Sequence, residues 1–240
     1  MNEKLVLTAL FGFIIAGAAL IVFFSFPSGN TANSATGQGA LASAHDSEMP
    51  FTAFDKALAS QLMDKDKDGK CDACGMAIKD CIASNMLQCD MDPKATMGLL
   101  GSAHAHAEFK VYVNGAPLDF SEYAELHEEA MQNKSAETSS FIHVHEEEAP
   151  HKAGEILHMH ASGIPLWVFF ESIGMEFSKD CLKINADEKF CNNESKTLKF
   201  YVNGRQNSTF ENYAPKDDDK ILISYGSESE EEIKGQLESI

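Results

Sequence analysis

Three His-x-His pairs constrain the fold of this chain most, because each lies where polar and apolar residues alternate with a period of two. Such alternation is typical of a half-buried β-strand, in which residues i and i+2 point to the same face. Each pair should therefore place both imidazoles on one face of a strand and apolar side chains on the other. The pairs are His104/His106, His143/His145 and His158/His160.

The second and third pairs are predicted to face each other across a β-hairpin whose turn is centred on Pro150–Lys152. Symmetry about that turn places His143 opposite His160 and His145 opposite His158. Opposed Cβ atoms lie ~5 Å apart, so the four imidazoles would gather on a solvent-side face. The other face would carry Ile142, Val144, Leu157 and Met159. Because imidazole ligates both Zn(II) and Cu(II), we predict a site for one such ion; a polar face without metal is the alternative.

The first pair is open to three interpretations. His104 and His106 can join the four-histidine site, form a second site, or simply be solvated. His151 lies in the predicted turn, and His45 and His127 stand alone, so no role is assigned to these three.

Four cysteines form a second group of donors, in the stretch Cys71-Asp-Ala-Cys74-Gly-Met76 and at Cys81 and Cys89 downstream. Thiolate and thioether are soft ligands that select Cu(I), which favours copper at this cluster. The spacing also allows a four-thiolate zinc site or two disulfides. A thiol–disulfide oxidoreductase would use Cys71 and Cys74 as its catalytic pair, but an acidic loop, not a strand, precedes them.

The string Cys-x-x-Cys-Gly-Met resembles the metal-binding motif of exported copper chaperones of the nitrous-oxide-reductase accessory type. The resemblance covers residues 71–76 alone. It implies copper as the cofactor; zinc, which the cysteine spacing also allows, is the alternative.

An acidic run precedes the cysteines and matches the start of a calcium-binding loop, with Gly69 at the sixth position. Gly75 stands where an EF-hand needs a bidentate Glu, so the run is closer to the shorter Asp-rich calcium loops of extracellular repeats. Calcium and a solvated acidic turn both stay open. The candidate ligands are Asp64, Asp66, Asp68 and Asp72.

Cys181 and Cys191 flank residues 182–190, which read as a hairpin, and we predict a disulfide between them. By constraining the unfolded chain, this bond would contribute ~2–3 kcal/mol of stability.

The uncharged run Leu5–Phe26 has 22 residues, against the ~20 that a helix needs to cross a bilayer. We predict an uncleaved signal anchor in the cytoplasmic membrane with the body facing outside; a cleaved signal peptide is the alternative. The membrane is thus the first predicted partner. The net charge of −18 excludes nucleic acid, and a protein that accepts or donates metal is a possible second partner.

The pattern predicts an α+β fold: an N-terminal transmembrane helix, then a small body rich in β-hairpins and similar to a β-grasp over 107–161. Two related strand–turn units, Lys110–Gly115 and Lys199–Gly204, support the hairpins. The predicted segments are an anchor at 1–26, a flexible linker at 27–50, an Asp/Cys/Met-rich segment at 51–101, the α+β body at 102–227 and an acidic tail at 228–240.

Several runs in the body, among them 141–145, 157–161, 167–172, 199–204 and 219–226, resemble a poorly characterised family of membrane-anchored exported proteins from archaea and candidate-phylum bacteria. Its members are often labelled protein-disulfide isomerase. The resemblance implies archaeal origin and export more than any activity.

Together these patterns predict a membrane-tethered extracytoplasmic protein that stores, buffers or delivers copper, or else zinc. The rival interpretations are a thiol–disulfide oxidoreductase and a disulfide-stabilised surface protein without catalysis.

Overall fold

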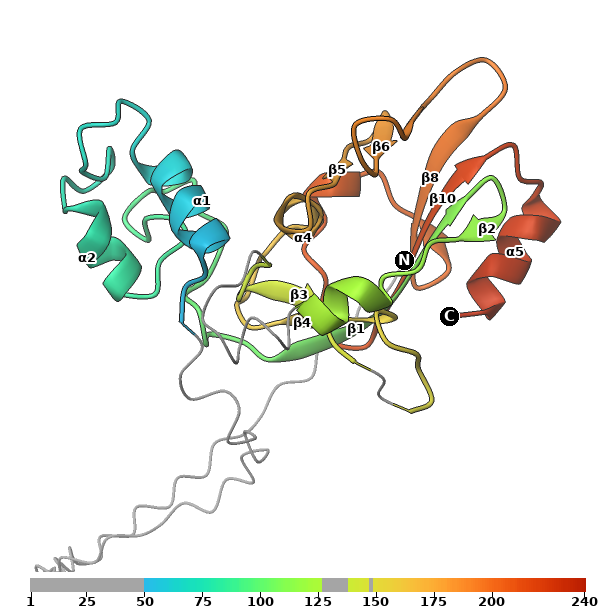
Figure 1. Ribbon diagram of the computed structural model, residues 1–240, viewed down its shortest axis with the longest axis horizontal. Coiled ribbons are helices and arrows are strands. Elements are labelled where there is room, and N and C mark those ends of the chain that lie inside the picture. Colours follow the sequence, from blue (N-terminus) through green and yellow to red (C-terminus); the bar gives the residue numbers. More distant parts are fainter. Residues whose placement is uncertain (1–49, 127–137, 147–148) are drawn as a thin grey trace, which may run out of the picture. The chain divides into compact units, whose positions relative to one another are not determined.

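Strand β1 (Ala105–Val113) organises a seven-stranded mixed sheet, because it pairs with three other strands. It runs antiparallel to β4 (Ile156–Met159) and β2 (Ala116–Pro117), and parallel to β10 (Asp219–Gly226). The computed structural model describes residues 50–126, 138–146 and 149–240, all within the unit Ala42–Ile240 (Figure 1).

The order of the large sheet is β3-β4-β1-β10-β8-β9, with β2 beside β1. Its remaining strands are β3 (Ile142–Val144), β8 (Thr197–Val202) and β9 (Arg205–Gln206). A second sheet has three strands in the order β5-β6-β7, which are β5 (Glu176–Phe177), β6 (Cys181–Lys183) and β7 (Lys189–Cys191).

The two predicted Asn-Gly hairpins are confirmed. Asn114 and Gly115 join β1 to β2, and Asn203 and Gly204 join β8 to β9. All four residues have φ between +52° and +79°, as a type I′ turn requires at both central positions. The longer strands of the two hairpins, β1 and β8, lie on either side of β10.

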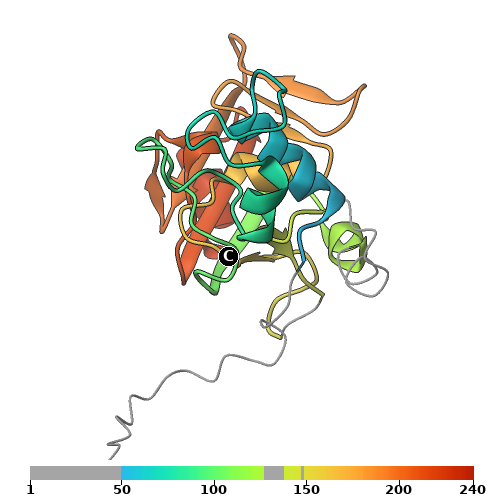
Figure 2. The ribbon, with the colours of Figure 1, turned by 90° about the vertical axis from the view of Figure 1, so that its left-hand side faces the viewer.

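Helix α1 (Ala53–Met63) begins at a capping box in which the side chains of Thr52 and Asp55 accept each other's backbone N–H groups. It packs against α2 (Ile78–Ala83) (Figure 2). Helix α4 (Leu166–Ser172) follows Pro165, and η1 (Phe210–Asn212) contacts it. Residues 121–126 are also helical.

The core lies between the large sheet and α4. In β1 the period-two pattern sends Phe109 inward, where its ring packs edge-on against Phe169 of α4, with 5.6 Å between ring centroids. Both side chains are fully buried.

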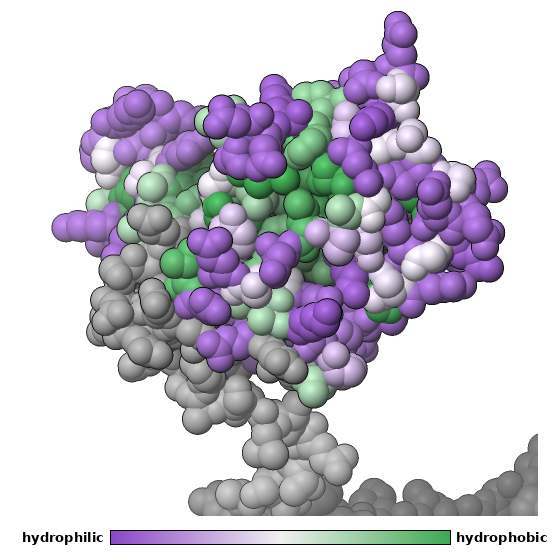
Figure 3. Space-filling view, turned by 45° about the vertical axis from the view of Figure 1, so that its right-hand side comes forward, coloured by the Kyte–Doolittle hydropathy of each residue, from purple (hydrophilic) through white to green (hydrophobic). Residues whose placement is uncertain are grey.

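At the surface, Figure 3 shows a face on which hydrophilic side chains surround a smaller hydrophobic area, as expected for an acidic protein in water.

The predicted acidic tail holds a helix, α5 (Glu230–Glu238), capped by the Ser229–Glu232 box. Ile233 is buried, and Lys110 of β1 donates a hydrogen bond to the carbonyl of Ser239 at 2.6 Å. The tail is therefore docked on the sheet rather than solvated along its length.

The disulfide between Cys181 and Cys191 is confirmed. The two residues are directly opposed where β6 pairs with β7, so the bond closes the short hairpin that the sequence predicted.

The predicted fold class is wrong. The body is a mixed α/β structure with a seven-stranded sheet, not a small set of hairpins in a β-grasp order. The reason is the parallel pairing of β1 with β10, which joins two distant parts of the chain into one sheet. In a β-grasp over 107–161, all strand partners of β1 would instead lie within that segment.

The transmembrane helix predicted as part of that fold class is not found. Among the residues that the structure describes, no helix is both long enough and apolar enough to cross a membrane. The predicted anchor at 1–26 and nearly all of the linker at 27–50 lie outside the described residues.

Candidate metal centre

Three neighbouring strands bring six histidines to one face of the large sheet. β4 lies between β3 and β1, and His158 on β4 is directly opposite His143 on one side and His106 on the other. Because side chains two residues apart share a face, the remaining members of the pairs belong to the same face. We call these residues the imidazole face: His104, His106, His143, His145, His158 and His160.

The predicted register of the hairpin is off by two residues. His143 pairs with His158, not with His160. A shift of two keeps every side chain on its face, whereas a shift of one would reverse them all. The apolar residues opposite the histidines are accordingly buried, as predicted: Ile142, Val144, Leu157 and Met159.

The imidazole face is not a solvent-side face, contrary to the prediction. His143 is 1% exposed, and His158 and His160 are 6% exposed. The segment just before α1 packs beside this face: Phe51 lies edge-on against Phe141, two residues before His143, with 5.1 Å between ring centroids. The imidazoles also cover one another, since the rings of His145 and His158 stack at 3.8 Å.

The ring nitrogens on this face form two groups of three. The β1 group is His104, His106 and His158; the β3 group is His143, His145 and His160. Within each group the candidate ligand atoms lie within 4.8 Å of one another. The structure therefore brings the first His-x-His pair into the same face as the other two, in a group that shares β4.

Burial keeps the centre of this face neutral. It lowers the pKa of His158 to about 2, and the charges that His145, His106, His160 and His104 would carry act in the same direction. A neutral imidazole keeps a lone pair for a metal ion. His158, in the middle of the face, is therefore neutral, the form that binds metal, across the physiological pH range.

A hydrogen-bonded support orients His143. Its Nδ1 atom lies 3.0 Å from the carbonyl oxygen of Ser139. Because a carbonyl can only accept, Nδ1 carries the proton and Nε2 keeps its lone pair. The Ser139 hydroxyl donates in turn to the Asp55 carboxylate at 2.7 Å. Such outer contacts fix the tautomer and orientation of metal-binding histidines.

Asp55 was not predicted as part of this centre. It is fully buried and also accepts hydrogen bonds from the backbone N–H groups of Ser140 and Thr52. Burial raises its pKa, and these hydrogen bonds oppose the rise. The Thr-x-x-Asp spacing could have indicated a helix cap, but no local signal shows that the cap also holds the start of β3.

Replacing Asp55 by alanine should lower the free energy of unfolding by ~2–4 kcal/mol, because buried donors lose their acceptor and α1 loses its cap. Urea denaturation measures the change. Glu232→Ala is the matched control, since Glu232 has the same capping-box position in α5 but is exposed; its loss should stay below ~1 kcal/mol. Equal losses in both variants would contradict a special role for the buried carboxylate.

The four cysteines of the N-terminal segment also converge. The sulfur atoms of Cys71, Cys74 and Cys89 lie within 4.8 Å of one another, and Cys81 on α2 interacts with Cys71 and Cys74. All four are free thiols, so the structure does not form the two disulfides that the spacing allowed as an alternative.

A tight turn presents the first two of these cysteines. The N–H of Cys71 donates to the Met76 carbonyl at 2.8 Å, and the N–H of Gly75 donates to the Cys71 carbonyl at 2.7 Å. Gly75 has φ +73°, which glycine adopts without strain. Cys71 and Cys74 are thus presented by a turn, whereas the oxidoreductase motif opens a helix.

The thiols differ in acidity. A hydrogen bond from the Met76 backbone, followed by one from Cys71, lowers the pKa of Cys74. Burial raises the pKa of Cys81 to about 11 and that of Cys89 to about 12. Met76, the predicted thioether ligand, is 40% exposed.

The predicted calcium ligands are only partly brought together. Carboxylate oxygens of Asp64, Asp66 and Asp72 lie within 4.8 Å of one another, and Asp68 is outside this set. Asp64 accepts from the N–H of Gly69 at 3.0 Å, and Asp72 from that of Lys65 at 3.1 Å. Hydrogen bonds to its own backbone therefore account for the shape of this loop.

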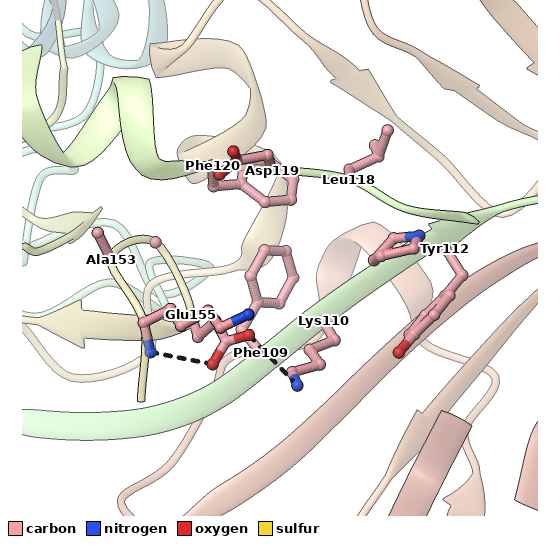
Figure 4. A pocket seen from close by; sticks show the side chains of 11 residues that line it. Phe109, Lys110, Tyr112, Leu118, Asp119, Phe120, Ala153 and Glu155 are labelled. Carbon is pink, nitrogen blue, oxygen red and sulfur yellow. Dashed lines mark hydrogen bonds and ion pairs between the residues drawn. The ribbon is translucent and has the colours of Figure 1, made fainter. Parts of the chain in front are cut away.

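A pocket of about 320 Å³ lies beside β1, between residues 109–112, 117–120 and 152–155, and none of the six histidines lines it. Figure 4 shows Lys110 and Glu155 joined across it, with 3.3 Å between Nζ and Oε1. Two charged side chains of its lining are already engaged with each other, so the pocket is a weaker candidate than the imidazole face.

No family model, curated protein or solved structure matches this chain. The resemblances drawn from residue patterns therefore stay predictions.

Proposed function

We propose that this protein binds copper or zinc through the imidazole face, and that it stores the metal or hands it on to another protein. One observation carries the proposal: six imidazoles from three strands share one face, with their nitrogens in two groups of three. A sheet face that packed only for stability would be filled with apolar side chains, because buried polar groups carry a desolvation cost.

The disulfide supports a location outside the cytoplasm. Disulfides persist in oxidising compartments and are rare in the cytosol, and Cys181–Cys191 is formed. An extracytoplasmic metal-binding protein is consistent with this bond.

The four-cysteine cluster adds a second, softer donor set. Thiolates bind Cu(I) and Zn(II) well, and the four thiols already gather without disulfides. An oxidoreductase is the less favoured function, because the Cys-x-x-Cys pair lies in a tight turn and four thiols, not two, meet there.

Replacing His106 and His145 together by glutamine should weaken binding of Zn(II) to the imidazole face by at least ~100-fold, the upper end of the loss seen when only an outer contact is removed. Both side chains are half-buried and each belongs to a different group. Isothermal titration of the full chain with Zn(II) measures the change. His151→Gln, outside the face, is the control, and a double variant that binds as wild type would refute the proposal.

A further inference from the structure

The imidazole face contains more donors than one ion can use. Zn(II) takes four ligands in a tetrahedron at ~2.0–2.1 Å, and three protein ligands with one open position is the common arrangement in reactive sites. Six imidazoles are present. The question is whether they converge on one point or on two.

The strand order separates them into two. The His104/His106 pair lies at the start of β1, with His104 just before the strand, and the His143/His145 pair lies at the end of β3, with His145 just after it; β4 lies between the two strands. Adjacent strands are ~4.8 Å apart, so the two pairs start from backbones separated by roughly 10 Å.

Within each pair the nitrogens have already converged. The Nε2 atoms of His104 and His106 are 3.0 Å apart, and those of His143 and His145 are 2.8 Å apart. Ligands of a tetrahedral ion with bonds of ~2.0–2.1 Å are separated by ~3.4 Å. β4 completes each pair with one further imidazole, His158 for β1 and His160 for β3.

The two groups differ in their exposure to solvent and in the hydrogen bonds that orient their imidazoles. His143 and His160 are buried, and His143 is held by the Ser139 carbonyl. In the β1 group, His104 is exposed and His106 is half-buried. The third member of each group changes this contrast little, since His145 of the β3 group is half-buried and His158 of the β1 group is buried. An ion in the β1 group would therefore be more open to solvent and competing ligands than an ion in the β3 group.

We propose that the imidazole face is a two-ion centre, with an exchangeable ion on the β1 group and a sheltered, slowly exchanging ion on the β3 group. This inference rests on the proposed function and adds its stoichiometry and its order of exchange. The open ligand position on the β1 ion is then the point at which metal enters from, or leaves to, a partner.

The test counts Zn(II) bound to the full chain by elemental analysis after removal of free metal. Zn(II) is the probe because, unlike Cu(II), it does not oxidise the thiols. His106→Gln and His145→Gln, each alone, should lower the count by one ion relative to wild type, and together by two. Any zinc held by the cysteines is common to all four proteins and cancels in the differences.

A chromogenic chelator then separates the two ions by rate. Wild type should release histidine-bound zinc in a fast and a slow phase; His106→Gln should lack the fast phase and His145→Gln the slow one. If either single variant loses as much zinc as the double variant, the face holds one shared ion and the inference is overturned. Two ions released at the same rate would overturn the inequivalence. A double variant with the wild-type count would instead refute the proposed function itself.

Discussion

Cys71→Ser combined with Cys74→Ser should lower the affinity for Cu(I) by at least ~10,000-fold, because hydroxyl groups are poor ligands for a soft ion and half of the thiolate set is lost. Competition with a colorimetric Cu(I) chelator under reducing conditions measures the change. The same titration with Zn(II) shows which metal the four thiols prefer.

Met76→Leu is the matched control for the thioether. Its side chain is 40% exposed, so the variant should change Cu(I) affinity by less than ~10-fold, as expected for a peripheral contact. A double cysteine variant that binds Cu(I) as tightly as wild type would contradict the thiolate site. If wild type catalyses insulin reduction and the double variant does not, the oxidoreductase alternative is favoured.

Local sequence patterns were sufficient to predict much of the imidazole face. Alternation around His143 and His158 indicated strands, and period two alone determined which side chains share a face. The predicted and observed pairings differ by two residues. Only a shift by an odd number of residues moves the side chains to the other face of the sheet, so the histidines were correctly predicted to share one face despite the error in register.

The register itself could not be read from the sequence. Val144 ends β3 and Ile156 begins β4, so the connection is far longer than the two-residue turns that fix pairing. The neighbour of β4 on its other side is β1, and that contact is what groups His158 with His106. Pairing between distant strands leaves no local trace in the sequence.

The fold class was predicted wrongly for the same reason. The alternation in β1 predicts a strand but not its partners, and β10 carries an apolar run that is compatible with any central strand. Asp55 illustrates the limit at the level of a single residue. Its cap could be predicted from spacing, whereas its hydrogen bonds to Ser139 and Ser140 depend on tertiary packing.

Acid should destabilise the metal-free protein steeply. The unfolded chain binds a proton at His158 near pH 6.5, whereas the folded protein does so only near pH 2. Between these values the unfolded state holds one more proton, so folding stability falls as the pH falls. The slope for one such histidine approaches about 1.4 kcal/mol per pH unit below pH 6.5, which amounts to about 2 kcal/mol from pH 6.5 to about 4.5.

Urea denaturation at a series of pH values, with a chelator present to keep the protein metal-free, measures this slope. Carboxylates also titrate in acid, so the informative quantity is the difference between wild type and His158→Gln, which lacks this imidazole but keeps a polar side chain. The wild-type slope should exceed that of the variant by about 1.4 kcal/mol per pH unit. Parallel curves for wild type and His158→Gln would mean that His158 takes up its proton as readily in the folded protein as in the unfolded chain. The centre of the imidazole face would then be open to water, contrary to the burial of His158 in the structure.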